Sequence, residues 1–375
     1  MTKRIVVLTT GRQDWGILRS TCHALKGRCE LRIFAGGMAV SEKHGNVANE
    51  IEREQFDVVR LPWPLTPEAP TEELSAATAS IGKALGAFRP DALVLVGDRS
   101  ETAAAALAAT ILRVPVAHLH GGEETEGAID NALRHAVTKL SHLHFVSHAH
   151  HAARVSQMGE AAETIENVGA PGLDNLHRPD LPDRKELEAT LGLELKGPVI
   201  LVTVHPTTLS AVPEEDALAV AAAMDRVPGT YVVTLPNADP GSEKVRHIMQ
   251  NAGARPGRVA VAALGERNFW GMLRIADAMV GNSSSAIIEA PAVGLPAVNV
   301  GDRQKGRLRA GNLIDVLASS DEVAAALEKA LSPAHRQEVL KTIEPSHDGK
   351  TGKRIADRIL SWSPPRPLRK RFIDR

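Results

Sequence analysis

Short, almost wholly apolar runs alternate with longer helix-forming stretches along most of this chain. The runs are rich in Val, Ile and Leu: Ile5–Leu8, Leu31–Phe34, Ala92–Val96, Val114–Leu119, His144–Val146, Val199–Val204, Tyr231–Leu235, Val259–Val261 and Ala278–Val280. Strands that are apolar on both faces and alternate with helices are typical of parallel sheets covered on both sides. The pattern therefore predicts an α/β protein with helices on both faces of its sheets.

The series of strands restarts after a charged stretch, residues 179–198, that carries prolines at both ends. The strands are too many for one compact sheet of this kind, so we expect a domain boundary between about Gly172 and Glu186. The prediction is two doubly wound, Rossmann-like domains, residues 1–175 and 176–350. A C-terminal helix and a basic tail in residues 351–375 are expected to pack back on the body, with the tail as a solvated surface segment.

Polar turns follow several of the predicted strands, which is where doubly wound sheets bind ligands. In the first half these turns are residues 9–12, 97–99 and 121–123, and in the second half they are residues 205–207, 236–239 and 281–285. Two such sets predict a ligand cleft between the domains.

The densest of these stretches is residues 281–306, which opens with a Gly-Asn-Ser-Ser-Ser turn directly after an apolar run. Helix-forming residues follow over 286–290 and end at Pro291 and Gly294. A strand, a turn of small residues and a helix start make an anion site, because backbone N–H groups and the helix dipole face the charge. Glu289 follows one turn later, within reach of a ribose hydroxyl. An ordinary capped helix would carry the same residues, so both interpretations stay open here.

Residues 118–135 form a second dense stretch, in which Glu123, Glu124, Glu126 and Asp130 follow a Gly-Gly pair. Two carboxylates with differently tuned environments can serve as acid and base, although acidic residues are also common in the first turn of a solvated helix. Asp98 ends a buried strand, so it must pair, for example with Arg99, or face a polar cleft, and we favour the cleft.

Composition excludes several classes of partner. The net charge is −1, with 24% charged and 43% hydrophobic residues, so no overall field attracts nucleic acid or a membrane surface. No apolar stretch approaches the roughly 20 residues of a membrane span. The two cysteines form no disulfide framework and no signal peptide is evident, which predicts a cytoplasmic protein. His118 and His120 have a spacing that zinc sites use, but no third ligand follows, so no metal site is predicted.

Several motifs together resemble one known family, the hydrolysing UDP-N-acetylglucosamine 2-epimerases. The motifs are Gly97-Asp98-Arg99-x-Glu101, HLHGGEETEGAIDNALRHAVTKLSHLHFV, Gly169-Ala170-Pro171-Gly172, Asn237-Ala238-Asp239-x-Gly241, GNSSSAIIEAP and NVGDRQKGRLRA. The similarity extends from the first strand almost to the end, including residues 348–350 and 368–372. The number of these motifs, their length and their order along the chain make the resemblance specific.

The resemblance implies a GT-B-like fold of two Rossmann-type domains with the nucleotide in the cleft. It implies conversion of UDP-N-acetylglucosamine and water to N-acetylmannosamine and UDP, for nonulosonic (sialic-type) acid biosynthesis. The family route is anti elimination of UDP to a 2-acetamidoglucal, then syn addition of water. No cofactor or metal is implied, and a homodimer or homotetramer is expected.

Positions that match the family motifs give the expected site. The expected catalytic residues are Asp98, Glu123, Asp130 and His205, of which His205 lies near the diphosphate. The expected nucleotide and substrate contacts are Arg12, Asp14, Arg99, His120, Gly172, Asn237, Asn282, Ser283, Ser284, Ser285, Glu289, Arg303 and Lys305.

Two departures from the family pattern bear on the substrate. The loop after the first strand reads Thr10-Gly11-Arg12-Gln13-Asp14-Trp15-Gly16, with a displaced glycine and a tryptophan in place of the usual tyrosine, and Thr207 follows His205-Pro206. Alternatives are the same reaction on UDP- or GDP-linked 2,4-diacetamido-2,4,6-trideoxyglucose or on GDP-N-acetylglucosamine. A non-hydrolysing epimerase, a GT-B glycosyltransferase and a nucleotide-sugar sensor are less consistent with the motifs.

Overall fold

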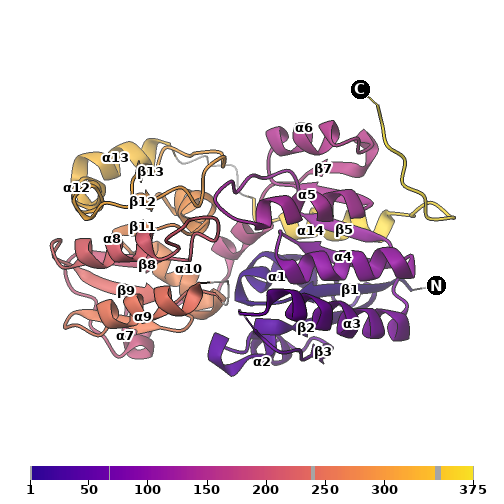
Figure 1. Cartoon of the computed structure of the whole chain (residues 1–375), viewed down its shortest axis with the longest axis horizontal. Coiled ribbons are helices and arrows are strands. Elements are labelled where there is room, and N and C mark those ends of the chain that lie inside the picture. Colours follow the sequence, from indigo (N-terminus) through magenta and orange to yellow (C-terminus); the bar gives the residue numbers. More distant parts are fainter. Residues whose placement is uncertain (1, 67, 238–240, 343–347, 375) are drawn as a thin grey trace. The chain divides into compact units, whose positions relative to one another are not determined.

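The apolar runs form two sheets, and every strand pairing in the described part of the chain is parallel. The computed structural model describes residues 2–66, 68–237, 241–342 and 348–374. Two units contain these sheets: unit 1 is Met1–Glu123, Asp130–His177 and Asp348–Arg375, and unit 2 is Glu124–Ile129 and Arg178–His347 (Figure 1).

Unit 1 is built on a seven-stranded sheet with the order β3-β2-β1-β4-β5-β6-β7. Its strands are β1 (Arg4–Thr9), β2 (Glu30–Gly36), β3 (Val58–Leu61), β4 (Ala92–Val96), β5 (Val116–Leu119), β6 (Leu143–Val146) and β7 (Ile165–Asn167). Alternate residues of β1 enter different cores, with Ile5 and Val7 on one face and Val6 and Leu8 on the other. Because both faces are covered, the central strands are apolar throughout.

Helices cover both faces of the unit 1 sheet. They are α1 (Arg12–Leu25), α2 (Val47–Arg53), α3 (Pro70–Phe88), α4 (Ser100–Leu112), α5 (Asp130–Leu140), α6 (Ala149–Gln157) and α14 (Thr351–Ser361), with 3₁₀ turns at Gly37–Val40, Glu42–His44, Ala162–Thr164 and η4 (Pro171–His177). Leu18 of α1 and Ile355 of α14 belong to one core, whereas Ile81 of α3 and Ala104 of α4 belong to the other.

Unit 2 repeats this plan with a six-stranded sheet of order β10-β9-β8-β11-β12-β13. Its strands are β8 (Val199–Thr203), β9 (Thr230–Thr234), β10 (Arg258–Val261), β11 (Ala278–Gly281), β12 (Ala297–Val300) and β13 (Leu313–Val316). Its helices are α7 (Arg184–Leu191), α8 (Glu215–Met224), α9 (Ser242–Gly253), α10 (Gly265–Ile275), α11 (Ser285–Ile288), α12 (Ser320–Leu331) and α13 (Pro333–Lys341), with the 3₁₀ turn η5 (Ala290–Val293). Apolar residues of α8, α9 and α12 form one core with β8, β9, β11 and β12.

The expected fold class, two doubly wound parallel α/β units, is confirmed. Four strands were not predicted: β3, β7, β12 and β13. Three of them lie at sheet edges and carry charged residues, namely Arg60, Glu166 and Asp315. An edge strand pairs on one side only, so it does not need to be apolar on both faces. β12 is interior but holds Asn299, whose amide binds the Asp315 carboxylate at 2.7 Å.

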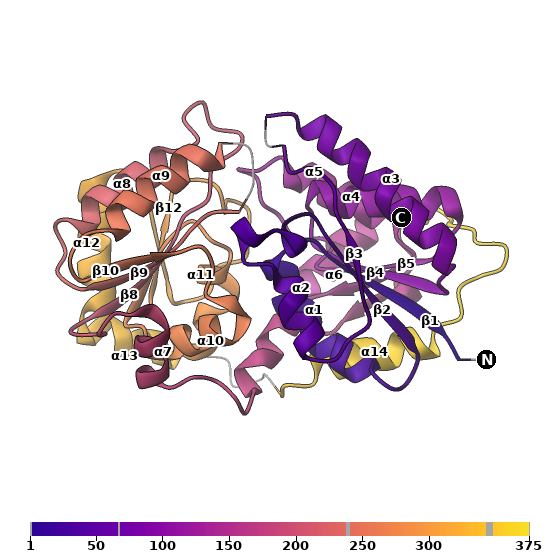
Figure 2. The same ribbon diagram turned by 90° about the horizontal axis from the view of Figure 1, so that it is seen from below.

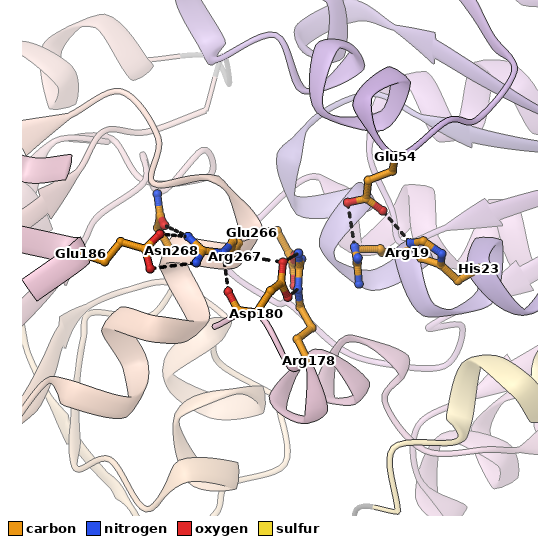
Figure 3. Close-up of polar contacts among 9 residues, drawn as sticks. All are labelled: Arg19, His23, Glu54, Arg178, Asp180, Glu186, Glu266, Arg267 and Asn268. Carbon is orange, nitrogen blue, oxygen red and sulfur yellow. Dashed lines mark hydrogen bonds and ion pairs between the residues drawn. The ribbon is translucent and has the colours of Figure 1, made fainter. Parts of the chain in front are cut away.

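The segment that follows His177 is fixed to α10 by ion pairs (Figure 3). Arg178 forms an ion pair with Glu266 of α10. It also pairs with Asp180, with 2.8 Å between Arg178 Nη2 and Asp180 Oδ2. Arg267 of α10 binds Glu186 through two contacts of 2.7 and 2.9 Å. These contacts give unit 2 a defined start at Arg178. The same figure shows Glu54 of unit 1 accepting from Arg19 and contacting His23, which joins α1 to the end of α2.

Helix α14 returns to unit 1 and packs on α1 (Figure 2). Asp174 of η4 caps it by accepting from the Thr351 and Gly352 N–H groups at 3.1 and 2.7 Å. The tail packs on unit 1, but the expected solvation does not hold for Lys370, whose ammonium binds carbonyl oxygens and Glu160 and whose side chain is 22% exposed. Within the described residues, no helix combines the length and apolarity needed to cross a membrane.

Candidate active site

The sheet of unit 1 reverses its direction of growth between β1 and β4, which are neighbours in space. Helix α1 follows β1 on one face and α4 follows β4 on the other. In doubly wound sheets the ligand crevice opens at the carboxyl ends of the two strands at such a reversal. Arg12 at the start of α1 and the pair Asp98-Arg99 after β4 lie at these ends.

Asp14 braces the loop after β1. Its carboxylate is buried and accepts from both the N–H and the hydroxyl of Thr10, each at 2.7 Å. Burial raises the pKa of Asp14 to about 6, opposed by the hydrogen bonds from Thr10. The contacts of Asp14 are therefore those of a loop brace, whereas Arg12 is partly exposed beside it.

Arg134 of α5 joins the polar ends of β4 and β5. Its guanidinium pairs with Asp98, donates to the His120 carbonyl oxygen at 3.0 Å and lies 3.8 Å from Glu123 Oε2. The Arg134 side chain is 2% exposed. A buried charge is stable only when opposite charges and acceptors surround it, so Asp98 and Glu123 are held as a pair by one cation.

Glu123 and His120 form the inner part of this cluster. His120 Nδ1 lies 2.6 Å from Glu123 Oε1, and Ser147 donates to the same oxygen at 2.9 Å. The Ser147 hydroxyl also lies 3.0 Å from Nδ1 of His151. Burial is the main cause that lowers the pKa of His151, to about 4, so His151 is neutral near pH 7. The Glu123 side chain is 4% exposed against 20% for Asp98, so Asp98 is the more accessible carboxylate.

The other expected residues of unit 1 lie around this cluster or on α1. Asp130 begins α5 and is four residues before Arg134, so both lie on one helix face. Arg99 pairs with buried Glu101 at 3.3 Å at the start of α4. Gly172 lies in η4, where its carbonyl oxygen accepts from Asn175, a residue that also donates to Gly16 of α1. The contacts of Gly172 therefore belong to the packing of η4 on α1.

Unit 2 has the matching reversal between β8 and β11. His205 follows β8 and Asn282 follows β11, and the two loops are linked. The His205 N–H donates to Asn282 Oδ1 at 2.7 Å, and Asn282 Nδ2 donates to the His205 carbonyl oxygen at 2.8 Å. Asn282 is fully buried, so its side chain braces the loops. The Asn237 N–H faces His205 Nδ1 at 3.5 Å, while Ala238 and Asp239 of the same motif lie outside the described residues.

A buried carboxylate, Asp216 of α8, ties these loops together. Its Oδ2 accepts from Asn282 Nδ2 at 2.7 Å and from the Thr207 hydroxyl at 2.9 Å. Gly301, after β12, has a φ of 72°, and a Cβ there would lie 2.2 Å from Asp216 Oδ1. Burial raises the pKa of Asp216. Three strand-end loops therefore meet at one side chain.

The serine turn is tighter than the sequence predicts. Helix α11 is a single turn, Ser285–Ile288, and the 3₁₀ turn η5 follows over Ala290–Val293. The turn uses the N–H groups of Ser285 and Ala286, which donate to Ser283 Oγ and to the Ser283 carbonyl oxygen. Within the described residues, neither the Ser283 N–H nor the Ser284 N–H donates a backbone hydrogen bond, so these two groups are the candidate donors to an anion. A one-turn helix adds little dipole, so these N–H groups and the hydroxyls are the candidate donors to an anion at this turn. Glu289 follows at its end, partly buried.

The segment Glu124–Ile129 packs within unit 2 on the loop that holds Arg303 and Lys305. The Glu126 N–H donates to the Lys305 carbonyl oxygen at 3.0 Å, and Arg307 donates to the Thr125 hydroxyl at 3.1 Å. Arg303 in turn donates to the Asn282 carbonyl oxygen at 3.2 Å, whereas the Lys305 side chain is exposed. Two sequence motifs, HGGEETEG and GDRQKGR, thus contact each other.

Sequence reasoning did not single out Arg134, Ser147, His151 or Asp216 as site residues. Arg134 could have been suspected, since it lies one turn after Asp130 in the same motif. Asp216 carries no such signal, because an acidic residue in the first turn of a helix is common without any function.

Comparisons with known proteins show which family the chain resembles. The family model described as UDP-N-acetylglucosamine 2-epimerase matches residues 23–360. GDP/UDP-N,N′-diacetylbacillosamine 2-epimerase (hydrolyzing) of Campylobacter jejuni is 33% identical over 90% of each chain. UDP-N,N′-diacetylbacillosamine 2-epimerase (hydrolyzing) of Legionella pneumophila is 34% identical over 94% of each chain.

The solved structure of UDP-GlcNAc 2-epimerase from Neisseria meningitidis, bound to UDP-GlcNAc, has the same fold. Its TM-score is 0.81 at 17% identity, with 95% of this chain and 99% of that chain covered. The predicted resemblance is thereby confirmed, and the chain belongs to the hydrolysing branch of the UDP-N-acetylglucosamine 2-epimerase family, whose members act on nucleotide-linked amino sugars.

Proposed function

We propose that this enzyme hydrolyses UDP-linked 2,4-diacetamido-2,4,6-trideoxyglucose, the nucleotide form of N,N′-diacetylbacillosamine, with inversion at C2. The products are UDP and free 2,4-diacetamido-2,4,6-trideoxymannose. The observation that carries the reaction class is the buried Arg134, which holds Asp98 and Glu123 together at the strand ends of unit 1.

The chemistry requires such a cluster because the C2 proton is not adjacent to a carbonyl. Its loss must accompany or follow cleavage of the anomeric C–O bond, when positive charge develops on the sugar ring. Preorganised carboxylates stabilise that charge and can exchange the proton. Asp98 is the candidate C2 base, because its carboxylate is more exposed than that of Glu123.

Glu123 acts through His120 in this proposal. The 2.6 Å contact fixes the His120 ring with Nδ1 toward the carboxylate, which leaves Nε2 to accept or deliver a proton. Asp130, on the Arg134 face of α5, is the third member of the acid–base set. Syn hydration of the glycal places the hydroxyl of water on C1 and a proton on C2, which completes the inversion.

The leaving group is assigned to unit 2. Cleavage of the anomeric bond leaves negative charge on UDP, and donors fixed before the reaction stabilise it. The Ser283 and Ser284 N–H groups, the serine hydroxyls, His205 and the Arg303 guanidinium are the donors that the loops of unit 2 offer. Glu289 is proposed to accept from the ribose hydroxyls.

The substrate assignment follows the two relatives from Campylobacter jejuni and Legionella pneumophila described above. Both relatives, at 33% and 34% identity, are named as 2-epimerases of UDP-linked N,N′-diacetylbacillosamine, the first of them also of the GDP-linked form. This differs from the N-acetylglucosamine nucleotide that the sequence motifs favoured, and it supports the alternative with the 4-acetamido and 6-deoxy groups. Cytidine or deoxythymidine nucleotides are not suggested by either relative.

Proton NMR in deuterated water tests the proposal directly. With the UDP-linked diacetamido sugar we expect free manno-configured sugar with deuterium at C2, together with UDP. The same spectra with UDP-N-acetylglucosamine and with the GDP-linked diacetamido sugar serve as matched comparisons. Faster turnover of either one would move the assignment to that substrate and keep the mechanism. A product that keeps its nucleotide, or protium at C2, would contradict hydrolytic 2-epimerisation.

A further inference from the structure

The segment Leu368–Asp374 lies on unit 1 at the C-terminal end of α5. Lys370 Nζ donates to the carbonyl oxygens of Thr138 and Lys139 at 3.0 and 2.6 Å and to that of Ser141. The same ammonium pairs with Glu160 at 2.9 Å. One side chain therefore binds three carbonyl oxygens at the end of the helix that carries Arg134.

The residues after Lys370 dock by shape as well as by charge. The Phe372 ring lies against Gly159, where a Cβ would come within 2.6 Å of it. Lys139 Nζ lies 4.9 Å from the centre of this ring, and the Ile373 N–H donates to the Gly159 carbonyl oxygen at 3.0 Å. Glycine is therefore required at 159 if the ring is to sit there. These contacts define a strap, residues 368–374, with one fixed register.

The electrostatics of the strap are complementary to a helix end. The last carbonyl oxygens of a helix have no partner within it and favour a cation nearby. Buried Glu160 supplies the countercharge and also binds Lys139 at 2.6 Å and His144 at 3.0 Å. A partly buried ammonium is held in one place only when such acceptors surround it.

A short series of hydrogen bonds leads from the strap to the carboxylate cluster. The Thr138 hydroxyl donates to the Arg134 carbonyl oxygen at 3.0 Å and lies 3.3 Å from His118 Nδ1. His118 Nε2 lies 2.7 Å from the carbonyl oxygen of Gly97, the residue before Asp98. Thr138 thus connects the strap to the Asp98–Arg134 pair on both sides. Its carbonyl oxygen accepts from Lys370, and its hydroxyl contacts the Arg134 backbone and, through His118, the residue before Asp98.

We propose that Lys370 is a positioning residue for the reaction: it fixes the end of α5, so that Arg134 reaches Asp98 and Glu123 together. The inference rests on the proposed function, because it assigns Lys370 an effect through the proposed catalytic carboxylates. It predicts an effect on turnover rather than on nucleotide binding, since the strap contacts unit 1 and the serine turn belongs to unit 2.

The test compares Lys370→Met with Arg369→Met, which removes an exposed neighbouring cation. Both are assayed as full chains with the nucleotide sugar that the wild type turns over, well below their unfolding temperatures. We expect Lys370→Met to lower kcat about 10-fold or more, with the Kd for UDP within twofold of wild type. For Arg369→Met, both kcat and the Kd for UDP should stay within twofold of wild type. An unchanged kcat in folded Lys370→Met would overturn the positioning role and leave the proposed function intact.

A double-mutant cycle separates positioning from general weakening of the fold. If Lys370 acts through Arg134, then adding Lys370→Met to Arg134→Lys should cost little further kcat, whereas independent effects would multiply and overturn the inference. If Lys370→Met fails to fold, Phe372→Ala is the substitute, because it loosens the same strap at an exposed side chain and should also lower kcat. A wild-type kcat in Phe372→Ala would overturn the positioning role. A wild type that turns over no nucleotide sugar would refute the proposed function, and the positioning role with it.

Discussion

Asp216→Ala tests the structure of the proposed nucleotide-binding loops most directly. The substitution removes the acceptor for Asn282 Nδ2 and the Thr207 hydroxyl, and hydrogen bonds to a charged group contribute about 1.5–3 kcal/mol each. Two such bonds set an upper bound of about 3–6 kcal/mol. Burial raises the pKa of Asp216, because a buried carboxylate loses its hydration. Removing the carboxylate also removes this cost, which offsets part of the free energy lost with the two hydrogen bonds. We expect a net loss of about 2–3 kcal/mol in the free energy of unfolding.

The functional consequence is a loosened His205 and Asn282, because the Asn282 side chain then keeps only its hydrogen bonds with the His205 backbone. UDP affinity, measured by titration calorimetry, should fall about tenfold, which is 1.4 kcal/mol of binding free energy. Asp216→Asn can present one oxygen to both donors and should lose less than about 1 kcal/mol. Glu215→Ala, at the exposed neighbouring position, is the surface control. A folded Asp216→Ala with wild-type UDP affinity would refute the reasoning.

Three further substitutions test other parts of the site. Asp98→Asn should lower kcat by about 10²–10⁴-fold with UDP affinity nearly intact, and near-normal turnover would remove Asp98 from the catalytic set. Glu289→Ala should weaken UDP binding about tenfold but leave the affinity for 2′,3′-dideoxy-UDP unchanged; equal losses for both ligands would move the ribose contact elsewhere. Asp14→Asn tests burial: because the folded-state pKa is raised from 3.8 to about 6, stability from this group is lost as pH rises through that window. In urea unfolding, the free energy of unfolding of Asp14→Asn relative to wild type should therefore rise by up to about 3 kcal/mol between pH 3.8 and pH 7. A fall in this difference over the same interval would contradict the argument.

The central strands could be predicted because both of their faces are buried. β4 and β8, for example, are buried at every position and read as uninterrupted apolar runs. β7 is not buried at any of its three residues, and β13 includes exposed Asp315, so neither has the composition of a core strand. The hydrophobic pattern thus reveals a strand to the extent that helices and neighbouring strands cover it.

The candidate loops were also predictable, since a strand end followed by glycine and polar residues is visible in one short stretch. What could not be predicted is which polar side chains turn inward. Asn282 and Asp14 were expected at the ligand. In the structure both are buried: Asn282 binds His205 and Asp216, and Asp14 binds Thr10, so their contact with a ligand stays a prediction. One residue type serves both purposes, and only the tertiary contacts distinguish them.

The two units solve the same physical problem with opposite charges. Loops at the carboxyl ends of parallel strands lie beyond the ladder of backbone hydrogen bonds, so side chains join them to one another. Arg134 of α5 joins the loops after β4 and β5, and Asp216 of α8 joins those after β8, β11 and β12. A buried charge tolerates only the arrangement in which all its partners are in place. Each brace therefore selects one loop geometry before any substrate binds, and this is the preorganisation that charge-stabilising catalysis requires.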